Sequence, residues 1–194
     1  MNNNDLMYLL KTRRTYRKFD ESRKIPNSVI EKMTSAVRYS SSAMNRQPLK
    51  YIYVQTEEYV NKIFENTRWA GILPGDIGIP KIGERPVMFV IVLADNELKS
   101  TYTEFDAGLA VSNMTLSAWS CGVGSCILGS VNRDGVREIL DISTEYDILY
   151  AVAFGYPIHE SFIEDFNGNI NYYVDDLKNY HVPKRNISDT VEII

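Results

Sequence analysis

The chain of 194 residues contains little cysteine and little histidine, and both shortages limit its chemistry. Its two cysteines, Cys121 and Cys126, are separated by four residues, which matches neither a disulfide framework nor a CxxC metal or redox pair. Its two histidines, His159 and His181, are too few for a histidine-based metal centre. We therefore expect no bound metal, and any redox chemistry would need an organic cofactor.

Long apolar runs, a secretory leader and a large excess of one charge are also missing. The longest apolar run is Val87–Ala94, whereas a membrane-spanning helix needs roughly 20 apolar residues. The segment Met1–Leu10 has no basic region ahead of its apolar residues, which argues against a secretory signal. A net charge of -4 argues against general affinity for nucleic acids or membrane surfaces. The sequence therefore predicts a cytoplasmic protein with no nucleic-acid or membrane partner.

No repeat, low-complexity tract or linker interrupts the chain, so residues 1–194 are predicted to form a single domain. A domain of this size buries about 70% of the surface of its unfolded chain, and it needs no disulfide or metal to hold a core. Residues 66–85 contain four glycines and two prolines. We expect this stretch to form an irregular excursion or lid.

Apolar periodicity predicts alternating helices and strands. The uninterrupted apolar run after Pro86 indicates a central strand covered on both faces. The helix expected at 102–120 is apolar around most of its circumference, so it should be buried in the core or in a subunit interface. The other expected elements are helices through Leu10, at 27–40, through Phe64 and at 133–140, and strands at 50–55 and 147–155. The candidate helix N-caps are Asn4 or Asp5, Ser28 in a capping box with Glu31, and Thr56. These proportions fit an α+β sandwich.

A cluster of positive charge stands out in this acidic chain. Seven basic residues fall within 14 positions: Lys11, Arg13, Arg14, Arg17, Lys18, Arg23 and Lys24. A solvated turn and a nucleic-acid patch are two interpretations. A third is a compact phosphate site, because arginine offers a fork of donors that matches phosphate oxygens and Thr15 adds a hydroxyl.

Three further segments carry weaker signals. The loop Ser40–Pro48 is rich in amides and hydroxyls that suit a heterocycle with alternating N–H and C=O groups, although an ordinary turn explains it equally. The glycines from Gly122 to Gly129 either let the backbone approach a flat ligand or form a helix cap and a turn. Cys126, inside that stretch, is read as a small hydrophobic residue rather than a nucleophile. The basic residues after Pro183 could complete a phosphate site.

Taken in order, these segments resemble the nitroreductase family of FMN-dependent oxidoreductases. The matching motifs are Arg13-Arg-Thr-Tyr-Arg17-Lys-Phe, Ser41-Ser-Ala-Met-Asn45-Arg-Gln47-Pro48, the helix and glycine turn from Gly108 to Gly129, Phe154-Gly-Tyr-Pro157 and the tail Val182-Pro-Lys-Arg185. Thr15 stands where the family usually has serine, and Leu49 where many members have tryptophan. The resemblance implies a three-layer α+β sandwich of helices around a mostly antiparallel sheet. It also implies an intertwined homodimer with FMN at the subunit interface, and a tail, residues 181–194, that packs on the partner subunit.

The resemblance also implies roles for individual residues. Arg13, Thr15 and Arg185 would bind the FMN phosphate, with Arg14 and Lys184 nearby, and Arg17 would lie near the flavin pyrimidine. Ser41, Asn45 and Gln47 belong to the loop that would approach the flavin, with Ser41 and Asn45 reaching it from the partner subunit. Cys126, Ile127, Leu128 and Gly129 would line one face of the ring, with a backbone N–H of Leu128 or Gly129 directed at N5. Trp69 would shape the acceptor pocket, or alternatively anchor the core.

No side chain is expected to act as a catalytic acid or base, because the chemistry would occur at flavin N5. The predicted activity is ping-pong transfer of hydride from NADH or NADPH to a small acceptor such as a nitroaromatic compound or a quinone. A flavin-binding sensor or scavenger with little turnover is the alternative. A nucleic-acid module built on residues 11–24 is a third hypothesis.

Overall fold

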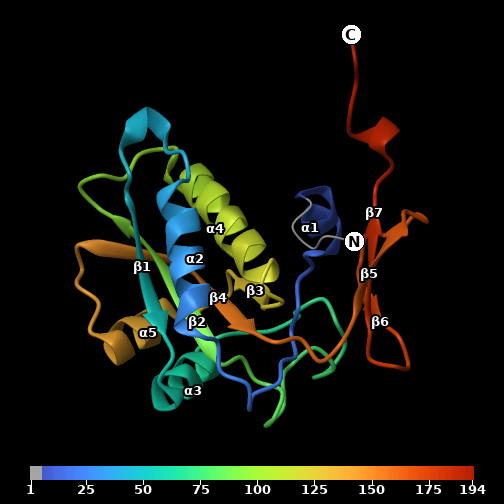
Figure 1. Cartoon of the computed structure of the whole chain (residues 1–194), viewed down its shortest axis with the longest axis horizontal. Helices are drawn as coiled ribbons and strands as arrows, with labels where there is room; N and C mark the ends of the chain where they lie inside the picture. The colour runs from blue at the N-terminus through green and yellow to red at the C-terminus, as the bar shows by residue number, and fades with distance from the viewer. Residues whose placement is uncertain (1–5) are drawn as a thin grey trace.

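The apolar run after Pro86 forms β2, Met88–Asp95, at the centre of a four-stranded sheet in the computed structural model, which describes residues 6–194 (Figure 1). The strand order is β1-β2-β4-β3, and every neighbouring pair is antiparallel. The flanking strands are β1 Leu49–Val54, β4 Tyr146–Gly155 and β3 Gly124–Leu128. The central position predicted for the apolar run is confirmed.

Side chains of β2 alternate between two separate cores. Phe89 and Ile91 contribute to one cluster together with Ile63, whereas Val90 contributes to the other together with Met114. Successive side chains of a strand point to opposite faces, so a strand with a core on each side is apolar at every position. The fold is therefore a three-layer α+β sandwich, as the sequence predicts.

The helices divide between the two faces of the sheet (Figure 1). Residues of α2 and α4 line one core, and residues of α3 and α5 line the other. The helix α1 lies near the C-terminal end of α4, where Trp119 Nε1 donates to Thr12 Oγ1 at 2.8 Å. The helices are α1 Leu6–Thr12, α2 Asn27–Arg38, α3 Glu57–Glu65, α4 Thr103–Trp119 and α5 Arg133–Leu140, with short 3-10 turns η1 Ala43–Asn45 and η2 Ile187–Asp189.

The helix starts differ in detail from the predicted caps. Pro26 is the N-cap of α2, and its carbonyl accepts the N–H groups of Val29 and Ile30, so the predicted capping box of Ser28 and Glu31 is wrong. The pyrrolidine ring of proline carries no hydrogen-bond acceptor, which explains why no side-chain cap is formed there. Thr56 is the N-cap of α3, without a side-chain hydrogen bond. The predicted caps Asn4 and Asp5 lie outside the described residues.

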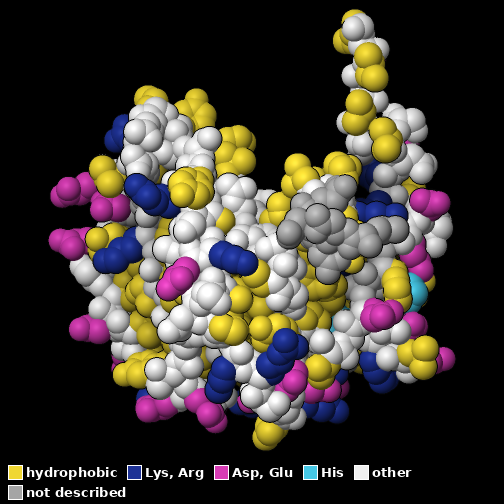
Figure 2. Space-filling model, in the orientation of Figure 1, with side chains coloured by type: hydrophobic (Ala, Val, Ile, Leu, Met, Phe, Trp, Pro, Cys, Tyr) yellow, Lys and Arg dark blue, Asp and Glu magenta, His cyan; other side chains and the backbone are white. Residues whose placement is uncertain are grey.

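One face of α4 is apolar and uncovered in the single chain. Phe105 is 66% exposed and Leu109 is 39% exposed, one helical turn apart. Hydrophobic side chains lie on both sides of the hollow between the top of α4 and the C-terminal segment (Figure 2). The inner face of α4 lies in the core, which is one of the two locations predicted for this helix. Its outer face is exposed and is available for the other predicted location, a subunit interface.

The structure contains a second, three-stranded sheet that the sequence does not predict, because residues 161–184 show no strand pattern. It has the order β5-β7-β6, with β5 parallel to β7 and β6 antiparallel to it. Its strands are β5 Ser161–Asp165, β6 Tyr173–Val174 and β7 Tyr180–Lys184. His181 links them, since Nδ1 lies 2.5 Å from Glu164 and Nε2 lies 3.1 Å from Asp175. Beyond η2 the chain extends away from the rest of the protein (Figure 1).

The excursion at 66–85 contains turns and bends but no helix or extended strand, as predicted. Its first residues attach to the segment that follows β3, through a bridge between Thr67 and Val131 and a 3.0 Å hydrogen bond from the Arg68 amide to the Ser130 carbonyl. Within residues 6–194, none of the helices has the length and apolar character to cross a membrane.

Candidate functional site

The basic segment after α1 lies directly beside β3, so the structure brings two of the predicted site segments together. The Tyr16 amide donates to the Ser125 carbonyl at 2.9 Å, and Thr15 forms a parallel bridge with Ser125. Tyr16 also stacks on Trp119 at the end of α4, with ring centroids 5.1 Å apart. Backbone pairing and ring packing therefore fix the segment from Arg13 to Arg17 against the edge of the main sheet.

Three arginines of this segment have unused donors. The Nε–H groups of Arg13, Arg14 and Arg17 are buried without a hydrogen-bond partner among residues 6–194. Burial lowers the pKa of Arg13, and burial followed by repulsion from Arg13 lowers the pKa of Arg14. Desolvated cations this close together are stabilised by an anion that accepts their free donors. The segment is therefore only partly solvated, and its role as a phosphate site stays a prediction.

Arg17 is held in place by three aromatic residues that were not predicted from the sequence as site residues. Its backbone N–H donates to His159 Nε2 at 3.0 Å. Its guanidinium lies over the rings of Tyr172 and Tyr180, at 4.5 and 5.2 Å from their centroids. These contacts join the basic segment to the second sheet. Since no sequence pattern placed residues 159–180 near residue 17, only the tertiary fold reveals them.

The strand β3 presents an alternating set of side chains to this region. Cys126 is 3% exposed, and burial raises the pKa of its thiol to about 11. The thiol is thus protonated at neutral pH, which supports its interpretation as a small hydrophobic residue. Ile127 is half exposed, whereas the side chain of Leu128 is buried. Of this stretch, Ile127 and the backbone around Gly129 are available to a flat ligand.

The glycines around β3 serve different purposes. Gly122 has φ +75° at the turn after α4, a backbone conformation that favours glycine. At Gly124 an added Cβ would lie 2.6 Å from Pro157 Cγ and 2.8 Å from the Tyr16 ring, so this glycine permits close packing of the basic segment. At Gly129 an added Cβ would meet nothing within 4 Å. Gly122 also has nothing within 4 Å, so Gly122 and Gly129 both border open space, and Gly129 is the one that directly follows β3.

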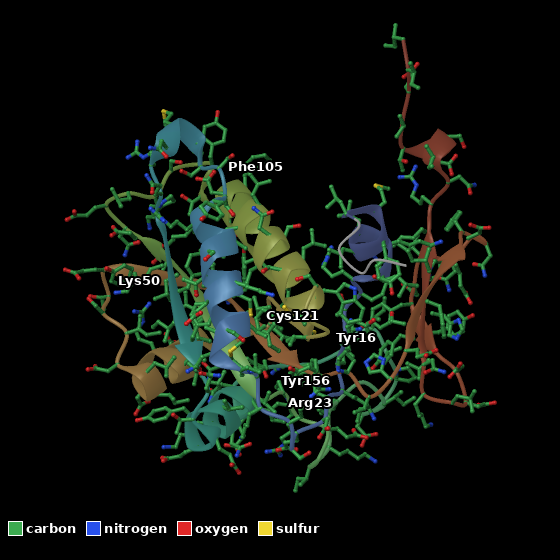
Figure 3. The ribbon with its side chains drawn as sticks, in the orientation of Figure 1. Tyr16, Arg23, Lys50, Phe105, Cys121 and Tyr156 are labelled. Carbon is green, nitrogen blue, oxygen red and sulfur yellow. The ribbon has the colours of Figure 1, made fainter. Side chains whose placement is uncertain are left out.

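The predicted loop residues Ser41, Asn45 and Gln47 lie at the other end of α4. The Ala43 amide donates to Asp106, in the first turns of α4, whereas Trp119 at its last residue contacts the basic segment through Thr12. Thirteen residues of helix separate these two anchor points, roughly 20 Å at 1.5 Å per residue. Figure 3 shows Phe105 at one end of α4 and Cys121 and Tyr16 near the other. One chain therefore does not bring the loop and the arginines together.

The remaining predicted residues are dispersed. Lys184 ends β7 and is exposed, as is Arg185, whose guanidinium donates to the Asp189 carbonyl at 2.7 Å. Trp69 is 6% exposed and lies in the core, where its ring packs against Phe64 and its Nε1 donates to Thr67 Oγ1 at 2.9 Å. This burial supports the core-anchor alternative for Trp69. Its role in an acceptor pocket stays a prediction.

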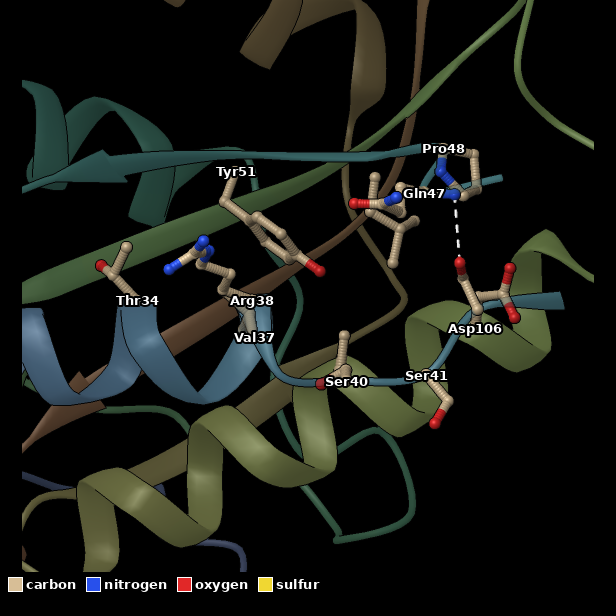
Figure 4. A pocket seen from close by; sticks show the side chains of 12 residues that line it. Thr34, Val37, Arg38, Ser40, Ser41, Gln47, Pro48, Tyr51 and Asp106 are labelled. Carbon is tan, nitrogen blue, oxygen red and sulfur yellow. Dashed lines mark hydrogen bonds between the residues drawn. The ribbon is translucent and has the colours of Figure 1, made fainter. Parts of the chain in front are cut away.

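Two hollows on the surface border these groups. One of about 260 Å³ lies under the Ser40–Pro48 loop and is lined by residues of α2, β1 and α4 (Figure 4). Another of about 570 Å³ lies between α1 and β5, where Tyr16, Trp119 and His159 line it. In the single chain, the predicted arginines line neither of these two hollows.

Comparison with known proteins agrees with this geometry. The sequence profile of the nitroreductase family matches residues 10–156. The chain therefore belongs to the nitroreductase family, and it is an oxidoreductase by that membership. The matched range includes the basic segment, the Ser40–Pro48 loop and β3.

Individual relatives are distant in sequence and close in fold. A protein of Methanothermobacter thermautotrophicus, provisionally named NADH dehydrogenase/NAD(P)H nitroreductase, is 26% identical over 159 residues, which cover 79% of this chain and 78% of the relative. A crystal structure of a Parabacteroides distasonis protein with the same provisional name has a TM-score of 0.69 at 20% identity, covering 89% of this chain and 98% of that one. A provisionally assigned nitroreductase of Desulfovibrio desulfuricans, crystallised with FMN, has a TM-score of 0.66 at 20% identity, covering 80% and 87%.

Proposed function

We propose that the chain is an FMN-dependent oxidoreductase that passes hydride from NADH or NADPH to a small electron-poor acceptor, such as a nitroaromatic compound or a quinone. The observation that carries this proposal is the set of unpartnered arginine Nε–H groups beside the open end of β3. Membership of the nitroreductase family, the FMN complex of the Desulfovibrio relative and the nicotinamide names of the other two relatives support it.

The residues of the basic segment fit the phosphate of FMN. Arg13 and Arg14 would donate to phosphate oxygens through their half-buried guanidinium groups, and Thr15, an exposed residue with a hydroxyl, lies between them and Arg17 in sequence. Hydrogen bonds to charged groups contribute about 1.5 to 3 kcal/mol each, so three or four hold a dianion without a covalent link. Binding would also relieve the repulsion that lowers the pKa of Arg14.

Bound FMN would supply the chemistry by accepting hydride at N5 and returning it to the second substrate. Arg17 would place a fixed positive charge near the pyrimidine, where negative charge develops on reduction. The His159 hydrogen bond and the rings of Tyr172 and Tyr180 keep that charge in position. A backbone N–H of Leu128 or Gly129 would face N5. The protonated thiol of Cys126 takes no part in proton transfer.

We further propose that the active form is a homodimer in which the loop with Ser41, Asn45 and Gln47 completes the partner's flavin site. The separation of this loop from the basic segment along α4 supports the proposal. So does the exposed apolar face formed by Phe105 and Leu109. Lys184 and Arg185 would then lie in a tail that packs on the partner.

The dimer is tested by charge substitutions on α4. We expect Phe105→Glu with Leu109→Glu to give a monomer in light scattering after gel filtration, with loss of bound flavin. Ile82→Glu is the control, because Ile82 is 86% exposed on the excursion and lies on no proposed interface. A double variant that stays dimeric would contradict the interface.

The cofactor is tested on the purified protein. It should be yellow and should release FMN on denaturation. A colourless protein that takes up no added FMN would overturn the proposal. Anaerobic stopped-flow mixing with NADH or NADPH should bleach the flavin rapidly, and an acceptor should restore it. Slow bleaching would instead indicate a flavin-binding protein with little turnover.

A further inference from the structure

Asp106 makes an unusual contact for a residue of a buried helix. Its side chain is 2% exposed, and Oδ1 accepts the backbone N–H of Ala43 at 2.9 Å. Its other oxygen, Oδ2, is buried and has no hydrogen-bond partner among residues 6–194. A buried carboxylate with a single hydrogen bond costs stability, and an apolar residue would be cheaper at this position. The first turn of α4 favours a negative charge, but that interaction does not require the carboxylate to be buried, whereas the contact with Ala43 does.

The loop that Asp106 contacts contains unfavourable backbone conformations. Met44, Asn45 and Gln47 have φ of +53°, +54° and +51°, in the left-handed region. For residues other than glycine this conformation is unfavourable, though less so for asparagine. Three such residues within four positions keep their conformation only when neighbouring contacts restrain them.

Several hydrogen bonds restrain this loop, including backbone turn bonds from Asn45 to Ser42 and from Arg46 to Ala43. Besides the bond from Ala43 to Asp106, the Gln47 amide donates to Ser42 Oγ at 3.1 Å, and Arg46 Nε donates to the Leu98 carbonyl at 3.0 Å. The bond to Asp106 reaches the core helix and has a charged acceptor, which makes it the strongest type among them. The others attach the loop to itself and to another surface turn.

The loop spans a hollow instead of resting on packed side chains. The hollow of about 260 Å³ beneath it is lined by Asp106 together with Pro48, Tyr51 and Ala110, among others (Figure 4). Since the space below is open, removal of the anchor at Ala43 leaves room for the loop to relax. The side-chain Nε2 of Gln47 already donates to Asn45 Oδ1 at 3.2 Å, so the two predicted flavin contacts would shift together.

We propose that Asp106 is a positioning residue, which fixes the Ser41–Gln47 loop in the conformation that meets the flavin, through the hydrogen bond between its carboxylate and the Ala43 amide. The inference rests on the proposed function for the identity of the ligand. The restraint of the loop itself does not depend on that ligand.

The experiment compares four variants with the wild type. Asp106→Ala and Asp106→Leu remove the acceptor, and leucine also fills the space and removes the buried charge. Asp106→Asn retains Oδ1 as an acceptor and should rescue the loop. Glu104→Ala, an exposed acid in the first turn of α4, is the matched control for the charge at the helix start.

Two readouts are measured on each variant. Tryptic cleavage after the exposed Arg46 in protein freed of FMN reports the loop alone. The dissociation constant of FMN, from flavin fluorescence, reports the completed site. We expect Asp106→Ala and Asp106→Leu to be cleaved at least tenfold faster and to bind FMN about tenfold more weakly. Asp106→Asn and Glu104→Ala should stay within about threefold of the wild type in both.

Each outcome separates the inference from the proposed function. Wild-type protein that binds no FMN overturns the function, while cleavage after Arg46 still tests Asp106. Wild-type cleavage rates in Asp106→Leu overturn the inference, whether or not FMN binds. Weaker FMN binding in Asp106→Leu without faster cleavage also overturns it, because the effect would then not act through the loop. If Asp106→Ala does not fold, Asp106→Leu supplies both readouts.

Discussion

The backbone N–H of Arg17 donates to Nε2 of His159, 142 positions later in the chain. Since Nε2 accepts, the proton of the neutral ring is on Nδ1, which lies 3.0 Å from the Glu160 carbonyl and donates to it. Burial, followed by the charges of Arg17 and Lys18, lowers the pKa of His159. A neutral imidazole with both nitrogens in use thus positions the cation proposed for the flavin site.

Acidification should weaken this contact. Because the pKa of His159 is lower in the folded protein, its contribution to stability is complete above about pH 6.5 and is lost as the pH falls through the folded-state pKa. We expect FMN affinity to fall over the same range. His159→Gln retains an acceptor without a titrating ring, so it should flatten this part of the profile in fluorescence titrations from pH 5 to 8. Equal pH profiles for variant and wild type would contradict the assignment.

His181 should act in the opposite direction. Its ring lies between Asp175 and Glu164, whose carboxylates raise its pKa. His181 in turn lowers the pKa of Glu164, and the pKa of Asp175 is lowered first by the backbone N–H of Asn179 and then by His181. His181 stabilises the folded state fully below about pH 6.5, and this stabilisation is lost as the pH rises through its raised pKa. The stabilisation by the two carboxylates is instead lost as the pH falls through their lowered pKa values. The second sheet should therefore be most protected between about pH 4.5 and 6.5. Hydrogen exchange of residues 161–184, corrected for intrinsic rates, measures this, and His181→Gln should abolish the maximum.

Arg13 and Arg17 should have separable effects. Arg13→Ala removes a phosphate donor and should raise the FMN dissociation constant by roughly 10- to 100-fold, from about 1.5 to 3 kcal/mol. Arg17→Ala should change affinity less and should chiefly lower the flavin reduction potential. Fluorescence titration and a redox titration of both variants provide the comparison. A larger loss of affinity in Arg17→Ala, with no change in potential, would show that the two roles are exchanged.

Trp69 should behave as a core residue. Trp69→Ala removes a buried ring in contact with Phe64 and should lower the free energy of unfolding by about 3 to 5 kcal/mol. Trp69→Phe keeps most of the packing and should lose much less. Urea unfolding measures both. If Trp69→Ala left stability unchanged but altered kcat/KM for the acceptor, the acceptor-pocket alternative would be favoured.

Strongly patterned segments could be predicted from the sequence, and tertiary contacts could not. The apolar run of β2 and the periodicity of α4 predict their elements because burial alone selects those residues. The sheet β5-β7-β6 gave no such signal. Phe162 and Ile163 in β5 are exposed, and polar contacts around His181 hold the strands together.

The candidate site shows the same division. The charges at Arg13, Arg14 and Arg17 are visible in the sequence, and so is the amide-rich loop. Asp106 and His159 are not, since each acts through a single hydrogen bond to a distant backbone amide. An acid in the first turn of an apolar helix and a histidine after a strand carry no spacing that indicates a partner.

The bridge between Thr15 and Ser125 has a consequence beyond the site. β3 is the last strand of its sheet, and a bare strand edge can pair with other chains and seed aggregates. The basic segment covers this edge with repelling like charges. Variants in which it detaches should therefore become prone to precipitation as well as inactive.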